Sequence, residues 1–301
     1  MEQEKKKHHY LPRFYLDGFT DPKSNRLWVY EKGIPEIRSS SPTKEGCQRF
    51  YHAFFTDDGH RDTNTIENYF EQIETKTACL LVSIHNRDRF TNDNKRELAL
   101  FISFMLTRVP LFRSEIEKMA AKHINDVGLD SAIADFETSI STFRGTLGIE
   151  PSFSQKDLLH LASDRGSILS LTHMFSIAFN FLPKLLALKW RFLFANNDIG
   201  YVTSDNPIYF YSPNSQGIGH DDFLNSDIEI TVPLSKKVSL LAKHCDIQSG
   251  YGDARNQSIK NINKRTIISA KARIYSDVKS DTLNSLVQKH QRDRPHMVLI
   301  N

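Results

Sequence analysis

Long apolar runs are missing from this chain of 301 residues. No stretch of about 18 consecutive apolar residues occurs, and the sequence therefore predicts no membrane-spanning helix and no membrane partner. The N-terminus carries charged residues and then a histidine pair, where a secretory signal peptide would have an apolar segment. We therefore expect the protein to be cytoplasmic.

Cysteine is also scarce, because only Cys47, Cys79 and Cys245 occur. They are odd in number, far apart and include no CxxC pair, which argues against a disulfide framework and against a cysteine-based zinc site. No P-loop and no dinucleotide-binding glycine pattern is present. Ser204 also lacks the GxSxG setting of a nucleophile elbow.

The net charge is small, at +3, and does not by itself imply a nucleic-acid partner. Its distribution is more informative, because residues 236–273 contain nine Lys or Arg and only two acids. This stretch could follow a phosphate backbone through residues such as Lys260 and Lys264. A solvated basic face is the alternative interpretation.

The periodicity of apolar residues predicts an α+β fold within a single domain, 1–301. A strand-rich segment (1–60) precedes a helical middle (64–188) and an α/β C-terminal part (190–301). We expect a mixed or antiparallel sheet, built from N- and C-terminal strands and packed against the helical region. Predicted helices cover 64–84, 94–109, 112–127, 130–145, 168–188 (with a kink or break at Pro183), 254–270 and 281–291. Predicted strands cover 26–30, 49–55, 191–195, 201–204, 208–211, 228–232, 238–241, 273–276 and 297–300, with turns at 57–59 and 196–198.

The first candidate site is the block His8-His9-Tyr10-Leu11-Pro12-Arg13. Histidine titrates near neutral pH and suits acid–base chemistry, metal binding or phosphate contact. If the block is extended, His8 and His9 face opposite sides, so only one of them can face a shared site. Arg13 could clamp a phosphate, and Tyr10 could stack on a base. Alternatively, the block is structural and locks an edge strand through aromatic packing and histidine–carboxylate hydrogen bonds.

The second candidate is the loop Thr203-Ser204-Asp205-Asn206-Pro207, which follows a predicted strand. Polar loops at strand ends commonly carry sites. Asp205 could act as a general base, a metal ligand or the group that orients a histidine, with Ser204 and Asn206 beside it. The same residue types also form ordinary turns.

The third candidate is the acidic series Glu67, Glu71 and Glu74, whose spacing places all three on one helix face. These carboxylates could meet His8, His9 or a divalent ion, or they could simply face solvent. Asn64 and Glu67 also resemble a capping box that starts this helix. His52 and His60 lie near three aspartates and are a weaker metal candidate without a known ligand spacing.

Several of these blocks resemble a bacterial family known as domain of unknown function 4238. The matching pieces are His8–Leu16 with Phe19, Leu27–Tyr30, Phe50-Tyr51, the helix Glu67–Glu74, Tyr201–Pro207 and Pro233–Ser235. The resemblance spans most of the chain and implies one long domain without an established activity. Its members tend to be stand-alone bacterial or mobile-element proteins, which would suit an antiphage or toxin role.

We therefore expect a phosphodiester hydrolase of the nuclease kind. His8 or His9 would be the general acid or base, with Asp205, Glu67 or Glu71 orienting it or holding a divalent metal. The substrate-binding candidates are Tyr10, Arg13, Tyr51, Ser204, Asn206, Lys260 and Lys264. The alternative is a binding or sensing protein in which the His-His-Tyr segment is structural. The sequence predicts no substrate, cofactor or oligomeric state beyond these expectations.

Overall fold

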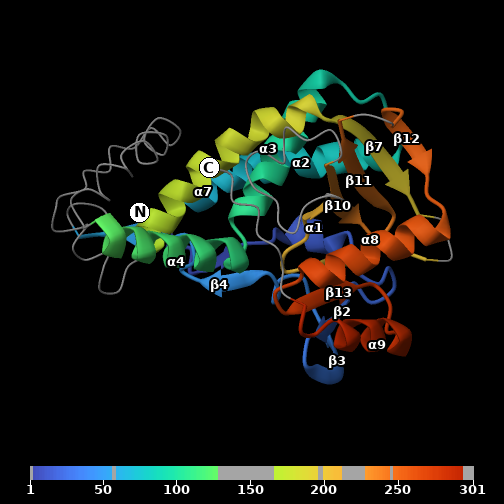
Figure 1. Cartoon of the computed structure of the whole chain (residues 1–301), viewed down its shortest axis with the longest axis horizontal. Helices are drawn as coiled ribbons and strands as arrows, with labels where there is room; N and C mark the ends of the chain where they lie inside the picture. Colours follow the sequence, from blue (N-terminus) through green and yellow to red (C-terminus); the bar gives the residue numbers. More distant parts are fainter. Residues whose placement is uncertain are drawn as a thin grey trace.

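The computed structural model of the protein describes residues 3–55, 59–127, 166–195, 199–211, 228–244 and 247–293. The predicted α+β class is confirmed, with strands at both ends of the chain and helices between them (Figure 1). Its helices are α1 (Arg13–Asp17), α2 (Thr65–His85), α3 (Asn92–Thr107), α4 (Pro110–Val127), α7 (Gly166–Ala187), α8 (Asn256–Ser269) and α9 (Asp281–Lys289). The first strands are β1 (Lys7–His9), β2 (Leu27–Glu31), β3 (Ile34–Ser40), β4 (Cys47–Arg49), β5 (Phe54–Phe55) and β6 (Arg61–Asp62). The later strands are β7 (Lys189–Phe194), β8 (Thr203–Ser204), β9 (Tyr209–Tyr211), β10 (Glu229–Ser235), β11 (Val238–Lys243), β12 (Gly250–Asp253) and β13 (Arg273–Ser276).

The larger sheet comes from the C-terminal part alone and has the strand order β12-β7-β11-β10-β9. Its pairs are antiparallel except for β12 and β7, which run parallel. Strand β10 is almost wholly buried, and its apolar residues join α2, α3 and α7 in the main hydrophobic core. The C-terminal end of α2 is tied to this sheet, because the His85 Nε2 atom lies 2.8 Å from the Ser235 Oγ atom.

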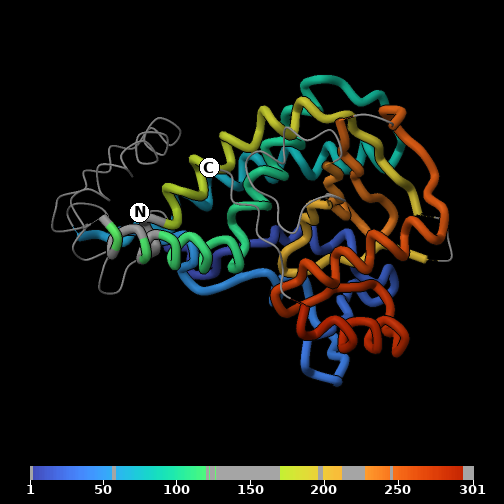
Figure 2. The backbone as a smooth tube through the Cα atoms, viewed as in Figure 1, coloured from blue at the N-terminus to red at the C-terminus, as the bar shows by residue number. Residues whose placement is uncertain are grey.

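The smaller sheet combines both ends of the chain, as the sequence predicts. Its order is β3-β2-β13-β8, so N-terminal β2 pairs antiparallel with C-terminal β13. Figure 2 shows the hairpin of β2 and β3, in blue, beside the C-terminal segment that contains β13 and α9, in red. A second, smaller core containing Tyr30, Ile274 and Val287 lies between this sheet and helices α8 and α9. Two further sheets have two strands each, β1 with β4 and β5 with β6. The smaller of the two main sheets contributes residues to both cores, because Val29 and Tyr275 belong to the main one.

The long helices follow their predicted apolar stripes, and α3 ends before Pro110, which begins α4, where its missing N–H costs nothing. Two details of the prediction are wrong. Helix α7 is not broken at Pro183, which lies inside it. Asn64 makes no side-chain cap bond at the start of α2, because its Oδ1 atom accepts the backbone N–H of Lys5 and Glu67 contacts a histidine. Among the described helices, none is long and apolar enough to span a membrane.

The N-terminal region departs most from the prediction. Arg13–Asp17 forms the short helix α1, and the predicted strand 49–55 is divided into β4 and β5. Phe50 has a φ of 56°, which breaks the extended chain and turns residues 50–53 inward. The strand β12 was not predicted. The predictions for 130–145, 196–198 and 297–300, and for Asp57 and Asp58 in the first turn, lie outside the described residues.

Candidate functional site

The histidine block begins as strand β1, which pairs antiparallel with β4. Because alternate residues of a strand face opposite sides, His8 points inward and is fully buried, while His9 is half-buried. The His8 Nε2 atom lies 2.8 Å from the Lys5 carbonyl oxygen and therefore donates to it. The His8 Nδ1 atom accepts the backbone N–H of His52 at 2.8 Å. Both ring nitrogens of His8 are thus hydrogen-bonded to the backbone, and these bonds define the tautomer that carries its hydrogen on Nε2.

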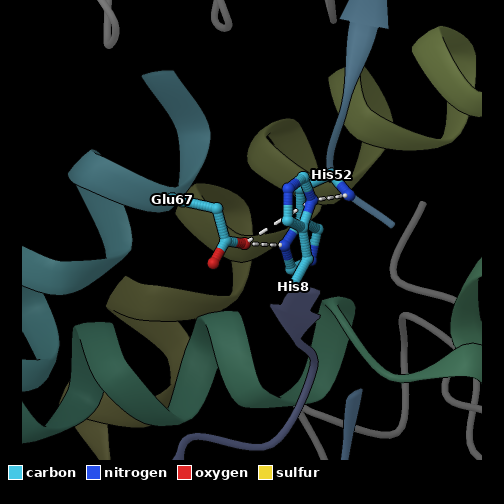
Figure 3. Close-up of side chains that lie close together, drawn as sticks. All are labelled: His8, His52 and Glu67. Atoms are coloured by element: carbon cyan, nitrogen blue, oxygen red, sulfur yellow. Dashed lines mark hydrogen bonds and ion pairs between the residues drawn. The ribbon is translucent and has the colours of Figure 1, made fainter. Parts of the chain in front are cut away.

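His52 lies beside His8 and forms the centre of the site. The two imidazole rings are stacked, with centroids 5.8 Å apart. The His52 Nδ1 atom lies 2.6 Å from the Glu67 Oε1 atom, which projects from the first turn of α2 (Figure 3). When Glu67 is ionised, Nδ1 must carry the hydrogen, and Nε2 then keeps a lone pair. A histidine oriented in this way by a carboxylate is the arrangement that hydrolases use for proton transfer.

Burial sets the protonation of this histidine–carboxylate pair. It lowers the pKa of His52 well below 6.5, and the positive charge of Arg108 lowers that pKa further. Burial also raises the pKa of Glu67, although Arg108 opposes this shift. The pKa of His9 is lowered by burial and partly restored by the charge of Glu67. His52 is therefore a neutral imidazole near pH 7, as a proton acceptor must be.

Several buried polar atoms around His52 have no hydrogen-bond partner among the described residues. They are His52 Nε2, His9 Nε2, the Tyr51 hydroxyl, and Nε and Nη2 of Arg108. Arg108 is almost fully buried, and only its Nη1 atom is used, in an ion pair of 2.7 Å with Glu74. Buried polar groups are nearly always paired, so a gathering of unpaired ones is typical of a site that completes its bonds with a ligand or water.

Three side chains of this site, His8, His52 and Glu67, could together hold a metal ion. Their present arrangement is that of a hydrogen-bonded group. The lone pair of His8 Nδ1 is taken by a backbone N–H. The 2.6 Å between His52 and Glu67 is shorter than the roughly 3.3 Å between neighbouring ligands of a tetrahedral ion with bonds of about 2.1 Å. A metal would therefore require His8 to give up a backbone bond and the His52–Glu67 pair to separate.

A polar depression of about 370 Å³ lies next to this group. Tyr51 lines it, and the Tyr51 ring contacts the His52 ring edge-on at 4.9 Å between centroids. Three cations, Arg49, Arg113 and Lys271, line the depression together with the single carboxylate of Glu117. Arg113 pairs with Glu117 at 3.0 Å and also lies over the Tyr51 ring. The depression is therefore suited to an anionic ligand.

The Asp205 loop is buried and is bound to the main chain around it. The Asp205 carboxylate accepts the backbone N–H groups of Lys271, Ala272 and Arg273 at 2.8–3.0 Å. Burial raises the pKa of Asp205, and these three bonds oppose the increase. The Ser204 hydroxyl donates to the Asn206 carbonyl oxygen, and the Asn206 amide donates to Ser269. The loop thus fastens β8 to the turn between α8 and β13.

The structure brings only part of the predicted site together. Glu67 approaches His8, with 3.9 Å between Oε1 and Nδ1, whereas the exposed Glu71 pairs with the half-buried Lys5 at 2.8 Å. No hydrogen bond or ion pair between described residues joins His8 or His9 to Asp205. The neighbouring residue Tyr10 does respond to Asp205, because burial and then the charge of Asp205 raise the pKa of Tyr10.

The remaining predicted residues occupy different places. Tyr10 is buried against the Tyr51 ring, at 5.8 Å between centroids. Arg13 is exposed and lies 3.7 Å from Asp17 of its own helix, so it is not directed at the His52 group. Lys260 and Lys264 are exposed on α8, and Lys260 lines a different hollow.

Sequence reasoning missed the importance of His52, Arg108 and Arg113. His52 appeared only as a weak metal candidate with His60, which is exposed. Arg108 carried a usable signal, since it is a charged residue between the apolar positions Leu106 and Val109 at the end of a buried helix. A charge in that setting requires a buried partner, which is Glu74.

Comparison with known families gives one match. The model of the family described as "Protein of unknown function (DUF4238)" matches residues 7–280. The chain belongs to the DUF4238 family. No curated protein and no solved structure matches it. In this DUF4238 member, two of the blocks that carry the resemblance supply the buried His8 and the Asp205 loop.

We expect replacement of His8 by alanine to destabilise the protein. The change leaves the Lys5 carbonyl and the His52 N–H without their buried partner and opens a cavity. The free energy of unfolding should fall by about 2–4 kcal/mol. Thermal unfolding of His8→Ala measures this, with exposed His60→Ala as a control that should change by less than about 0.5 kcal/mol. An unchanged melting temperature for His8→Ala would contradict the assigned structural role.

Proposed function

We propose that this protein is a phosphodiester hydrolase of the nuclease kind, with His52 as its proton-transfer residue. The observation that carries the proposal is the buried His52–Glu67 pair, with an unpartnered Nε2 atom, beside a depression lined by three cations. A phosphodiester is an anion whose hydrolysis needs a proton acceptor for the nucleophile and a positive environment for the phosphate. Tyr51, which lines the depression and contacts the His52 ring, connects the proposed proton acceptor to the proposed phosphate site.

The proposed step assigns a role to each group. A phosphate in the depression lies against Arg49, Arg113 and Lys271. The His52 Nε2 atom removes a proton from the attacking hydroxyl or water as its oxygen bonds to phosphorus. The P–O bond to the leaving group then breaks, and the leaving oxygen takes up a proton. Glu67 orients the ring through Nδ1 and stabilises the imidazolium that forms. His8 is a positioning residue, because it holds the His52 backbone.

This proposal moves the catalytic role from the His8-His9 pair to His52 and keeps Glu67 as its partner. Lys260 and Lys264 stay in the proposal as candidates for contact with a longer strand. We keep the cytoplasm as the proposed compartment, because Cys47 and Cys79 are free thiols. An antiphage or toxin role would follow if the substrate is nucleic acid.

A second candidate function is binding of an anionic ligand without turnover. It is favoured by one specific observation, the full burial of the His52 side chain. In this alternative, the depression recognises a phosphate group, and the His8–His52–Glu67 group only supports its wall.

The cations of the depression provide a test of the proposed substrate class. In the cleavage-deficient His52→Asn background, Arg49→Ala and Lys271→Ala should each weaken binding of a single-stranded oligonucleotide. Each should also reduce the slope of log K against log salt by about one. Fluorescence anisotropy across a salt series measures both effects. Lys264→Ala on α8 is the matched comparison.

A smaller slope for Lys264→Ala alone would place the strand on α8 instead of in the depression. Unchanged slopes for Arg49→Ala and Lys271→Ala would contradict the proposed phosphate site.

A further inference from the structure

A second and larger hollow lies on the C-terminal side of the molecule, apart from the His52 group. Its volume is about 650 Å³, within the range of small-molecule sites. Helices α8 and α9 and the end of β13 form its walls, and these elements lie together in Figure 1.

The apolar part of the lining is entirely aliphatic. Ile199, Val202, Val278, Leu283 and Leu286 contribute it, and no aromatic side chain lines the hollow. Val278 is 53% exposed and therefore offers an apolar surface that a ligand can reach. Planar rings such as nucleobases are commonly held by aromatic stacking, which this hollow cannot supply. The lining suits a flexible hydrocarbon.

The charged part of the lining is positive. Lys260 and Lys289 are exposed, and neither forms an ion pair with a described carboxylate. The one carboxylate in the lining, Asp277, is already paired with Lys236 at 3.2 Å. Two uncompensated ammonium groups beside an aliphatic surface favour a ligand with an anionic head.

Most polar groups in the walls are already used by the fold. Asn263 accepts the Val202 N–H and donates to the Gly200 carbonyl, both at about 3 Å. Ser276 accepts from the Val278 N–H, and Ser280 caps α9 by accepting from the Leu283 N–H. Among the uncharged side chains of the lining, the exposed hydroxyl groups of Thr282 and Ser285 remain, so the ligand should be apolar apart from its head.

We propose that this hollow binds an aliphatic carboxylate of the fatty-acid class. The hydrocarbon chain lies along Val202, Val278 and Leu283, and the carboxylate lies between Lys260 and Lys289. Lys260 is also a candidate contact for a longer nucleic-acid strand, but the hollow shares no lining residue with the depression beside His52, and its ligand does not depend on phosphodiester cleavage. The assignment therefore survives even if the protein cleaves no phosphodiester.

Isothermal titration calorimetry with dodecanoate, below its micelle concentration, tests this proposal on the full chain. We expect saturable binding with a negative heat-capacity change, as burial of hydrocarbon requires. The double variant Lys260→Glu/Lys289→Glu should weaken binding at least tenfold. Ser285→Trp places a large side chain into the hollow from an exposed position on α9 and should abolish binding.

Lys264→Glu is the matched charge control, because Lys264 lies one turn further along α8 and does not line the hollow. It should leave dodecanoate binding unchanged. Dodecanol, which has the same chain without the charge, should bind at least tenfold more weakly. Absence of saturable dodecanoate binding, or binding that Ser285→Trp leaves intact, would overturn the proposal. Equal binding of dodecanol would overturn the role of the two lysines.

Discussion

Replacement of His52 by asparagine should reduce phosphodiester cleavage by about 10²–10⁴-fold. Asparagine keeps a hydrogen-bond donor near the position of Nδ1, so the contact with Glu67 can persist. It has no atom at the position of Nε2, so the proton acceptor is lost. The imidazole ring also packs against His8, Tyr51 and Phe70, so the smaller side chain should lower the free energy of unfolding by about 1–3 kcal/mol. Initial rates on oligonucleotide substrates, with melting temperatures measured alongside, separate catalysis from folding.

Glu67→Gln provides the companion variant for a positioning role. Glutamine can still contact Nδ1, but it cannot stabilise the imidazolium by charge. We expect a smaller loss of kcat than for His52→Asn, with KM nearly unchanged. Exposed His60→Asn serves as the control for handling and expression. Full activity of the His52→Asn protein would remove His52 from the mechanism.

Replacement of Asp205 by alanine should cause the largest loss of stability, about 3–5 kcal/mol in the free energy of unfolding. The Asp205 carboxylate accepts three backbone N–H bonds from residues 271–273. Alanine would leave these donors buried without an acceptor, at the junction of β8, β13 and α8. Asparagine keeps one acceptor oxygen, so Asp205→Asn should lose less stability than Asp205→Ala.

Chemical denaturation with both Asp205 variants measures this effect. Asp93→Ala, at an exposed position in the first turn of α3, should cost no more than about 0.5 kcal/mol. A stable Asp205→Ala protein that has lost cleavage would contradict the structural assignment and return Asp205 to a catalytic role.

The fold was predicted well where local periodicity decides the structure. The apolar residues from Ile66 to Ile84 recur at helical spacing, and α2 covers that stretch. A sheet that combines N- and C-terminal strands was also expected, and the structure shows that β2 and β13 make this connection. The division of the predicted strand 49–55 was not expected. It is caused by the left-handed backbone conformation of Phe50, and an aromatic residue in the sequence gives no signal for that conformation.

The sequence predicted individual residues of the candidate site but not how they come together. His8 and Glu67 were both candidates, but His52 connects them, and its contacts bridge 44 and 15 positions of the chain. Such contacts depend on how β1, β4 and α2 pack, which single-sequence patterns do not encode. The same holds for Asp205, whose residue type suits catalysis and turn formation equally and whose partners lie 66–68 positions away.

The most direct test of the central claim is the pH dependence of oligonucleotide cleavage by the wild-type protein and by His52→Asn. Only the unprotonated Nε2 atom can accept a proton, so activity should be lost as pH falls through the pKa of His52. Because burial lowers that pKa below 6.5, the acidic limb of kcat/KM should lie below pH 6.5, and activity should be level near pH 7. The variant should show neither the limb nor the wild-type rate. A wild-type protein without cleavage, or a variant with the same limb, would contradict the account.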